Sequence, residues 1–246
     1  MDAGTSGILL FALNENEKCR VKTILAERNH VHKIYIAKVK GRFEWERVVV
    51  EKQILFKNGK GRTTMNDPNA KHAKSIFYRI EYDEKSDQTL ILCKIFTGRR
   101  HQIRLHLKSL QFSIVNDTEY GAKLTQYQKQ LKKMIGYCFE KSLCFPFKSK
   151  IGHPLHMKWN KKHDEKETFP PAKELHEAIY EDLESCLTFC LHSWIYMIED
   201  QVFVSALPAW TKQYSKDLLA KTLQLLALHE NIQYEIICKA IKDVYS

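Results

Sequence analysis

A change of pattern at residue 97 constrains this chain more than any other feature of its sequence. Residues 89–96 form an almost uninterrupted apolar run, which predicts a strand buried on both faces. The next eleven residues read T-G-R-R-H-Q-I-R-L-H-L, and apolar side chains take helical spacing at Ile103, Leu107 and Leu110. We therefore expect a buried strand that leads directly into a helix, with Thr97 and Gly98 at the helix cap.

Positive charges follow the same spacing. Arg100, Arg104 and Lys108 lie four residues apart, so they should project together from a second face of the expected helix. The first turn of a helix also presents free N–H groups, and both features suit an anionic partner. The alternative is a solvent-exposed basic face without a ligand, which is the commoner case for charges at this spacing.

The rest of the chain predicts mostly strands. We expect helices over 15–28 and within 213–245, a turn at 57–61, and strands over 8–13, 32–40, 48–56, 75–82, 88–96 and 187–206. Because segments 75–82 and 88–96 suit a hairpin and helices intervene irregularly, the sheet must be at least partly antiparallel. The expected fold class is α+β, with a mixed, largely antiparallel sheet and flanking helices.

Composition divides the chain into four regions. Residues 1–122 and 186–210 carry the strand patterns of a core, whereas residues 123–185 are rich in lysine and proline and indicate an insertion with a weak helix at 173–184. Residues 211–246 are rich in leucine and predict a helical tail that begins with a cap at Ser215.

Four motifs, in this order, resemble those of the RluA-type pseudouridine synthases. The opening D-A-G-T-S-G, from Asp2, with the apolar residues after it, is similar to the motif of the family's catalytic aspartate. The strand K-I-Y-I-A-K-V-K-G resembles the one that carries the family's active-site tyrosine, here Tyr35. The arginine stretch after residue 96 and the turn I-V-N-D-T-E-Y-G at 114–121 resemble the two motifs that follow. The resemblance covers residues 2–122, resumes near 187–210, and is nearest to the eukaryotic branch that modifies the tRNA anticodon arm.

The resemblance implies an isomerase that converts specific uridines in RNA to pseudouridine, in tRNA first and rRNA as the alternative, without cofactor or metal. It implies that Asp2 is the nucleophile, that Tyr35 stacks on the flipped uracil and relays its C5 proton, and that Arg104 keeps Asp2 ionised and in place. Whether Asp2 attacks C1′, attacks C6 or takes the 2′ proton stays open. RNA phosphates would be contacted by lysines and an arginine, namely Lys33, Arg100, Lys108, Lys132 and Lys133.

The chain departs from the family pattern at two places. The sequence begins at the position of the motif's leucine, so the His-Arg pair that precedes the aspartate in the family is absent, and residues 110–113 lack the family's L-G-H-P turn. These departures define an alternative, an N-terminally truncated isoform that keeps the fold and binds RNA with little or no turnover.

Charge and cysteine content agree with an RNA partner. The formal net charge of +10 and a pI near 9.1 suit a polyanion. Seven cysteines without framework spacing indicate thiols in a reducing compartment, so we expect the cytoplasm, with mitochondria or the nucleus as alternatives. No apolar run approaches the ~20 residues of a membrane span, so no membrane partner is expected. Cys186, Cys190 and His192 are close in sequence, but they lack C-x-x-C spacing and a second pair, so we expect no metal.

Overall fold

The computed structural model describes residues 2, 4–27, 31–126, 128–129, 188–212, 214, 218–230, 237, 239–241 and 244. Most of the expected insertion at 123–185 lies outside the described residues, together with its expected helix at 173–184 and both Lys132 and Lys133. The expected cap residue Ser215 and Cys186 lie outside them as well.

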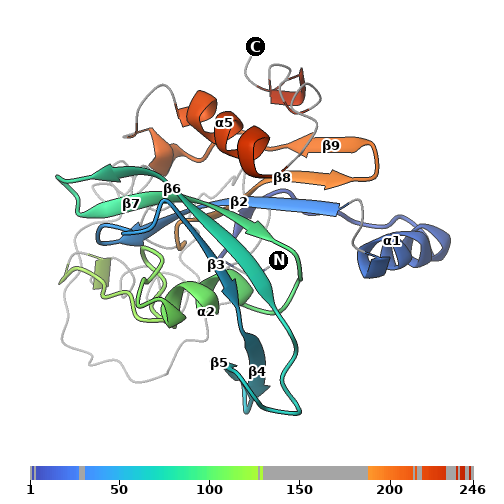
Figure 1. The fold of residues 1–246 in the computed structure, drawn as a ribbon, viewed down its shortest axis with the longest axis horizontal. Coiled ribbons are helices and arrows are strands. Elements are labelled where there is room, and N and C mark those ends of the chain that lie inside the picture. The colour runs from blue at the N-terminus through green and yellow to red at the C-terminus, as the bar shows by residue number, and fades with distance from the viewer. Residues whose placement is uncertain are drawn as a thin grey trace, which may run out of the picture.

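A seven-stranded sheet forms the centre of the molecule, in the order β1-β8-β2-β7-β6-β3, with β9 also paired to β8 (Figure 1). Only the pairing of β1 with β8 is parallel, so the predicted α+β fold with a largely antiparallel sheet is confirmed. Its strands are β1 (Ser6–Gly7), β2 (Val31–Lys40), β3 (Arg47–Glu51), β6 (Lys74–Asp83), β7 (Gln88–Ile95), β8 (Leu191–Ile198) and β9 (Gln201–Val204).

A hairpin and several helical segments add to the sheet. The hairpin forms a second, two-stranded sheet and turns at Asn58 and Gly59, which both have positive φ, as a two-residue hairpin turn requires. Within the described part of the chain, no helix is long and apolar enough to cross a membrane. These elements are β4 (Gln53–Lys57), β5 (Lys60–Thr64), α1 (Glu15–Glu27), α2 (Gln102–Ser109), a short 3-10 helix (Ala209–Thr211) and α5 (Leu218–Glu230).

Each face of the sheet carries its own hydrophobic core. Side chains alternate along β2, which buries Ile34 in one core and Val39 in the other. Leu226 of α5 packs into the first core and Leu107 of α2 into the second. The two helices accordingly lie on opposite faces of the sheet (Figure 1). The strand expected at 32–40 is therefore β2, and it is covered on both faces.

Helices and hairpins that are set by residues close together in the sequence form where they were predicted. The helix expected at 15–28 is α1, and the backbone N–H of Glu17 donates to Oδ1 of Asn14 at 2.8 Å, as an N-cap requires. The expected hairpin is formed by β6 and β7, and the strand expected at 187–206 is the hairpin of β8 and β9. The single strand expected at 48–56 is instead two strands, because β3 pairs with β6 and β4 with β5, and between them the N–H of Lys52 donates to the carbonyl of Ala73.

The prediction of a strand at 8–13 is wrong. β1 pairs with β8 only at Ser6 and Gly7, and the ladder ends where the N–H of Ile8 donates to the carbonyl of Ser193 at 3.0 Å. Farther along the same strand, residues 195–198 of β8 already pair with β9. The apolar segment therefore has no strand to join, and Phe11 is 77% exposed.

Candidate active site

The first strand brings Asp2 to the start of α2. The pairing of Ser6 with His192 fixes the end of the chain against β8, and the N–H of Thr5 donates to the carbonyl of Asp2 at 3.0 Å. Gly4 lies so close to Phe189 that a Cβ at this position would sit 2.3 Å from the ring. A side chain at this position would therefore have to displace the Phe189 ring, so glycine lets the chain pass here and place the Asp2 carboxylate at α2.

Helix α2 begins later than predicted. Its N-cap residue is His101, in the left-handed conformation with φ of 52° and without a side-chain cap. Thr97 and Gly98 are thus wrong as the cap. The hydroxyl of Thr97 instead donates to Oε1 of Gln102, and the N–H of Arg99 donates to the same oxygen. The Gln102 side chain ties this tight strand-to-helix connection together.

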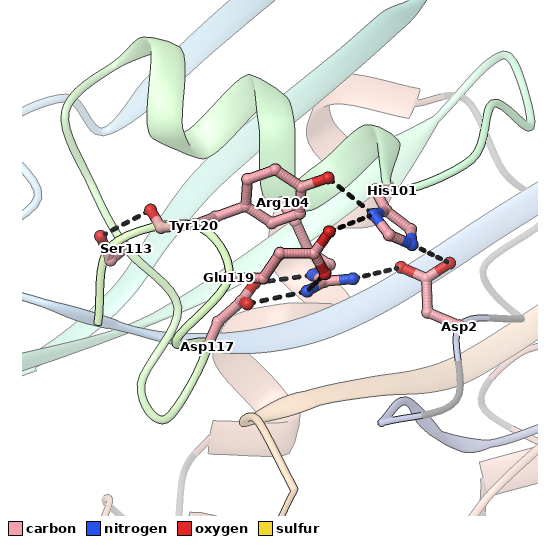
Figure 2. Close-up of polar contacts among 7 residues, drawn as sticks. All are labelled: Asp2, His101, Arg104, Ser113, Asp117, Glu119 and Tyr120. Atoms are coloured by element: carbon pink, nitrogen blue, oxygen red, sulfur yellow. Dashed lines mark hydrogen bonds and ion pairs between the residues drawn. The ribbon is translucent and has the colours of Figure 1, made fainter. Parts of the chain in front are cut away.

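Arg104 lies at the centre of three carboxylates (Figure 2). Its strongest contact is a two-pronged pair with Asp117, with Nε–Oδ2 at 2.7 Å and Nη2–Oδ1 at 2.8 Å. Nη2 also donates to Oε2 of Glu119 at 2.8 Å, and Nη1 lies 3.4 Å from Oδ2 of Asp2. The guanidinium is only 5% exposed and Asp117 only 1%, so this is a buried ion pair with Asp2 as its outer partner.

Two aromatic rings hold the guanidinium from its sides. Arg104 lies 4.6 Å from the ring centroid of Tyr120 and 4.5 Å from that of Phe189. Burial works against the charged form, but the hydrogen bonds and charge of Asp117 outweigh it, so the pKa of Arg104 is raised. Arg104 therefore stays charged and fixed, which is the role implied for it towards Asp2.

Tyr35 lies on β2, opposite Ser193 of β8, on the face of the sheet that carries α2. Burial is the main cause that raises the pKa of Tyr35, and the Asp2 charge adds to it, against a hydrogen bond with Ser193 that lowers it. The phenol is consequently protonated at neutral pH, and it lies close enough to Asp2 for the carboxylate charge to raise its pKa. Tyr35 thus lies on the same face of the sheet as α2, the helix that carries Arg104.

The prediction that three cations project together from one face of α2 is wrong. Arg104 is buried against carboxylates and cannot meet a phosphate, while Arg100 precedes the helix and lies exposed over the ring of Phe56 at 5.1 Å. Lys108 is exposed with its ammonium 5.5 Å from the centroid of Tyr120. Lys33 lies 5.4 Å from the ring centroid of Tyr196, near Gly98. Three of the five residues predicted to contact RNA thus lie around this site, and the other two are outside the described residues.

Three residues that contact Arg104 were not predicted as site residues from the sequence. Asp117 and Tyr120 belong to the turn at 114–121, whose likeness to a family motif was visible but whose partner on α2 was not. Glu119 carries no sequence signal, because its place beside Arg104 depends only on how the turn packs. For metal ligands, the described residues contain no group of three or more His, Cys, Asp or Glu side chains placed to hold an ion. Nδ1 of His192 instead lies 2.8 Å from the hydroxyl of Ser6.

Comparison with known proteins gives the same assignment. Residues 1–109 match the family model of RNA pseudouridylate synthases. Over 151 residues the chain is 32% identical to the tRNA pseudouridine(31) synthase of Saccharomyces cerevisiae. This match covers 54% of this chain and 37% of the relative. Over 125 residues it is 38% identical to the mitochondrial tRNA pseudouridine(32) synthase of the same organism, spanning 49% of this chain and 26% of the relative. The chain therefore matches well under half the length of these two relatives.

A solved structure supports the fold independently. The human protein RNA pseudouridylate synthase domain containing 1 superimposes with a TM-score of 0.55 at 18% identity, covering 91% of this chain and 78% of that one. The fold is thus that of a pseudouridylate synthase domain. Over residues 1–109 the chain is thus similar to RNA pseudouridylate synthases.

Proposed function

We propose that this protein is an RNA pseudouridine synthase that uses Asp2, Tyr35 and Arg104 as its catalytic residues. The observation that carries the proposal is the Asp2 carboxylate 3.4 Å from a buried, charged Arg104, with Tyr35 on the face of the sheet that carries α2. As part of this proposal, residues 1–122 and 186–210 form the catalytic domain, and residues 123–185 and 211–246 are additions to it.

The reaction breaks the N1–C1′ bond of uridine and rejoins C1′ to C5, and the C5 proton leaves to solvent. A carboxylate can start this by attacking C1′ or C6 or by taking the 2′ proton, and in each case the Arg104 guanidinium, 3.4 Å away, would hold it in place. The uridine must leave its stack at a cost of a few kcal/mol. Stacking on Tyr35 returns roughly 1–3 kcal/mol, so backbone contacts at the rim have to supply the remainder.

For the substrate we propose tRNA. Both yeast relatives are named as tRNA pseudouridine synthases, and the chain's net charge of +10 suits a polyanion. Lys33, Arg100 and Lys108 are proposed to meet RNA phosphates. Lys132 and Lys133, outside the described residues, are proposed to contact RNA as well. Free thiols at Cys19, Cys93 and Cys190 support a reducing compartment, for which we propose the cytoplasm.

Tritium release from tRNA labelled at uridine C5 tests the proposal. Asp2→Asn keeps the size of the side chain but removes its charge, so release should disappear while tRNA binding persists. Asp200→Asn, in the exposed turn between β8 and β9, is the matched control and should behave like the parent. Turnover retained in Asp2→Asn would refute the catalytic assignment, and a parent that binds tRNA without release would favour the binding-only alternative.

A further inference from the structure

His101 combines a strained backbone with a specifically oriented ring. It is one of the non-glycine residues with positive φ, at 52°, a region that side chains enter only when the surroundings hold them there. Its side chain is 11% exposed and packs edge-on against Phe56 and Tyr120, with ring centroids 5.5 and 5.6 Å away. The fold thus places this imidazole in one orientation.

The two nitrogens of the ring face different partners (Figure 2). Nδ1 lies 2.6 Å from the Tyr120 hydroxyl and 3.6 Å from Oε1 of Glu119. Nε2 faces Asp2, with Oδ1 at 4.0 Å. Arg104 contacts the other oxygen of the same carboxylate, Oδ2. Asp2 therefore lies between an arginine and a histidine, one at each oxygen.

We propose that His101 is a positioning residue that, as the neutral Nε2–H tautomer set by the Tyr120 hydroxyl, holds Oδ1 of Asp2 while Arg104 holds Oδ2. This inference rests on the proposed role of Asp2. A bare Nε2 lone pair would repel the carboxylate, so the proton belongs on Nε2, and Nδ1 then accepts from the Tyr120 hydroxyl. The 4.0 Å contact is longer than a hydrogen bond, and such contacts in ligand-free sites often shorten when substrate binds.

The electrostatic surroundings agree with a neutral ring. The charged and titratable groups that face His101 are Asp2, Arg100, Arg104, Glu119 and Tyr120. Burial is the main cause that lowers the pKa of His101 below its usual value, and the two arginines act in the same direction, against the carboxylates. Burial likewise raises the pKa of Tyr120, so its hydroxyl keeps the proton that Nδ1 needs.

Holding both oxygens matters because one contact at 3.4 Å leaves the carboxylate free to turn about its Cβ–Cγ bond. Misplacement of a reacting group by about 1 Å can cost on the order of 100-fold in rate. Residues that orient a reacting group typically contribute about 10–100-fold. The loss should appear in kcat, because the proposed role of His101 is to orient Asp2 and not to bind RNA.

Two substitutions separate this role from a structural one. In His101→Gln the side-chain amide can donate from about the position of Nε2, whereas in His101→Asn it reaches only about the position of Nδ1. The backbone preference runs the other way, because asparagine tolerates positive φ better than glutamine does. A purely structural histidine would therefore be replaced better by asparagine, and a positioning histidine by glutamine.

The kinetic experiment compares kcat and KM for tritium release in the parent, the two His101 variants and Tyr120→Phe. We expect kcat to fall about 10–100-fold in His101→Asn, less in His101→Gln, and KM to stay near the parent's. Tyr120→Phe should lower kcat because it removes the group that sets the tautomer. Equal or better turnover of His101→Asn relative to His101→Gln would overturn the inference.

The tautomer can be measured without any activity. Nitrogen-15 chemical shifts of the His101 ring near neutral pH should report Nε2–H in the parent, and a mixture of tautomers in Tyr120→Phe. A proton on Nδ1, donated to the Tyr120 hydroxyl and passed from it towards Glu119, would overturn the inference. A parent without turnover would refute the proposed function instead, and the nitrogen shifts would still decide the state of His101.

Discussion

Replacing Arg104 by methionine should destabilise the protein strongly, and Asp117, rather than Asp2, should be the reason. The substitution leaves a carboxylate that is 1% exposed without its two-pronged partner, while Asp2 and Glu119, at 19% and 47%, can turn towards water. Removing one member of a buried pair typically costs about 3–5 kcal/mol. For a chain of this size each kcal/mol lowers Tm by roughly 2–4 °C, so the fall should be about 6–20 °C.

Urea and thermal unfolding followed by circular dichroism measure this loss. Arg20→Met is the matched control, because Arg20 also pairs with two carboxylates, Glu17 and Glu199, but is 57% exposed. Exposed pairs contribute about 0–1 kcal/mol, so this control should change little. A loss in Arg104→Met no larger than that in Arg20→Met would refute the argument from burial.

A double variant isolates the unpaired charge. Arg104→Met combined with Asp117→Leu removes both members of the buried pair, and an apolar replacement of a buried pair is often neutral. The double variant should therefore be more stable than Arg104→Met alone. Additive losses would show that the cost comes from lost packing between Tyr120 and Phe189 and not from the stranded carboxylate.

Three further predictions use other parts of the structure. The free energy of unfolding should fall as pH falls from about 6.5 to about 4. Burial lowers the pKa of His106 and His192 to about 4, so only the unfolded chain takes up protons in that window. A flat profile in urea titrations would contradict this. Gly4→Ala should displace the Phe189 ring and lower turnover. Gly98→Ala should leave turnover unchanged, because its Cβ would meet only the Lys33 ammonium, at 3.7 Å. Equal turnover of the two variants would count against the close approach at Gly4. Arg100→Glu should flatten the dependence of log K on log salt in tRNA binding by about one contact, roughly 0.7–0.9 in slope, and an unchanged slope would remove Arg100 from the RNA surface.

The sheet could be predicted where its evidence is local. The alternation along β2 shows that both faces are covered, and the Asn58-Gly59 turn and the β6–β7 hairpin depend on neighbouring residues. The strand expected at 8–13 has the right residues and still does not form. The edge it would join is taken by β9, some two hundred residues away in sequence, and no local pattern contains that competition.

The catalytic aspartate and tyrosine could be proposed from motif likeness, but the environment of Arg104 could not. The i, i+4 spacing of Arg100, Arg104 and Lys108 looks like a surface row, and spacing alone does not say which member turns inward. What turns Arg104 inward is the turn that carries Asp117 and Glu119, together with Phe189 from the last strands. Those partners come from two separate parts of the chain, so only the tertiary structure brings them to Arg104.

The charges of the site impose a direction on substrate entry. Three carboxylates face one guanidinium, so acidic side chains outnumber the buried cation they surround, which disfavours phosphates there. The cations lie outside it, with Arg100 over Phe56, Lys108 over Tyr120 and Lys33 over Tyr196. For the proposed reaction, the backbone is therefore attracted to the rim while only the uncharged uracil and its ribose can reach Asp2. The same arrangement explains why Arg104, although it lies in a basic stretch, acts on a carboxylate of its own chain and not on RNA phosphates.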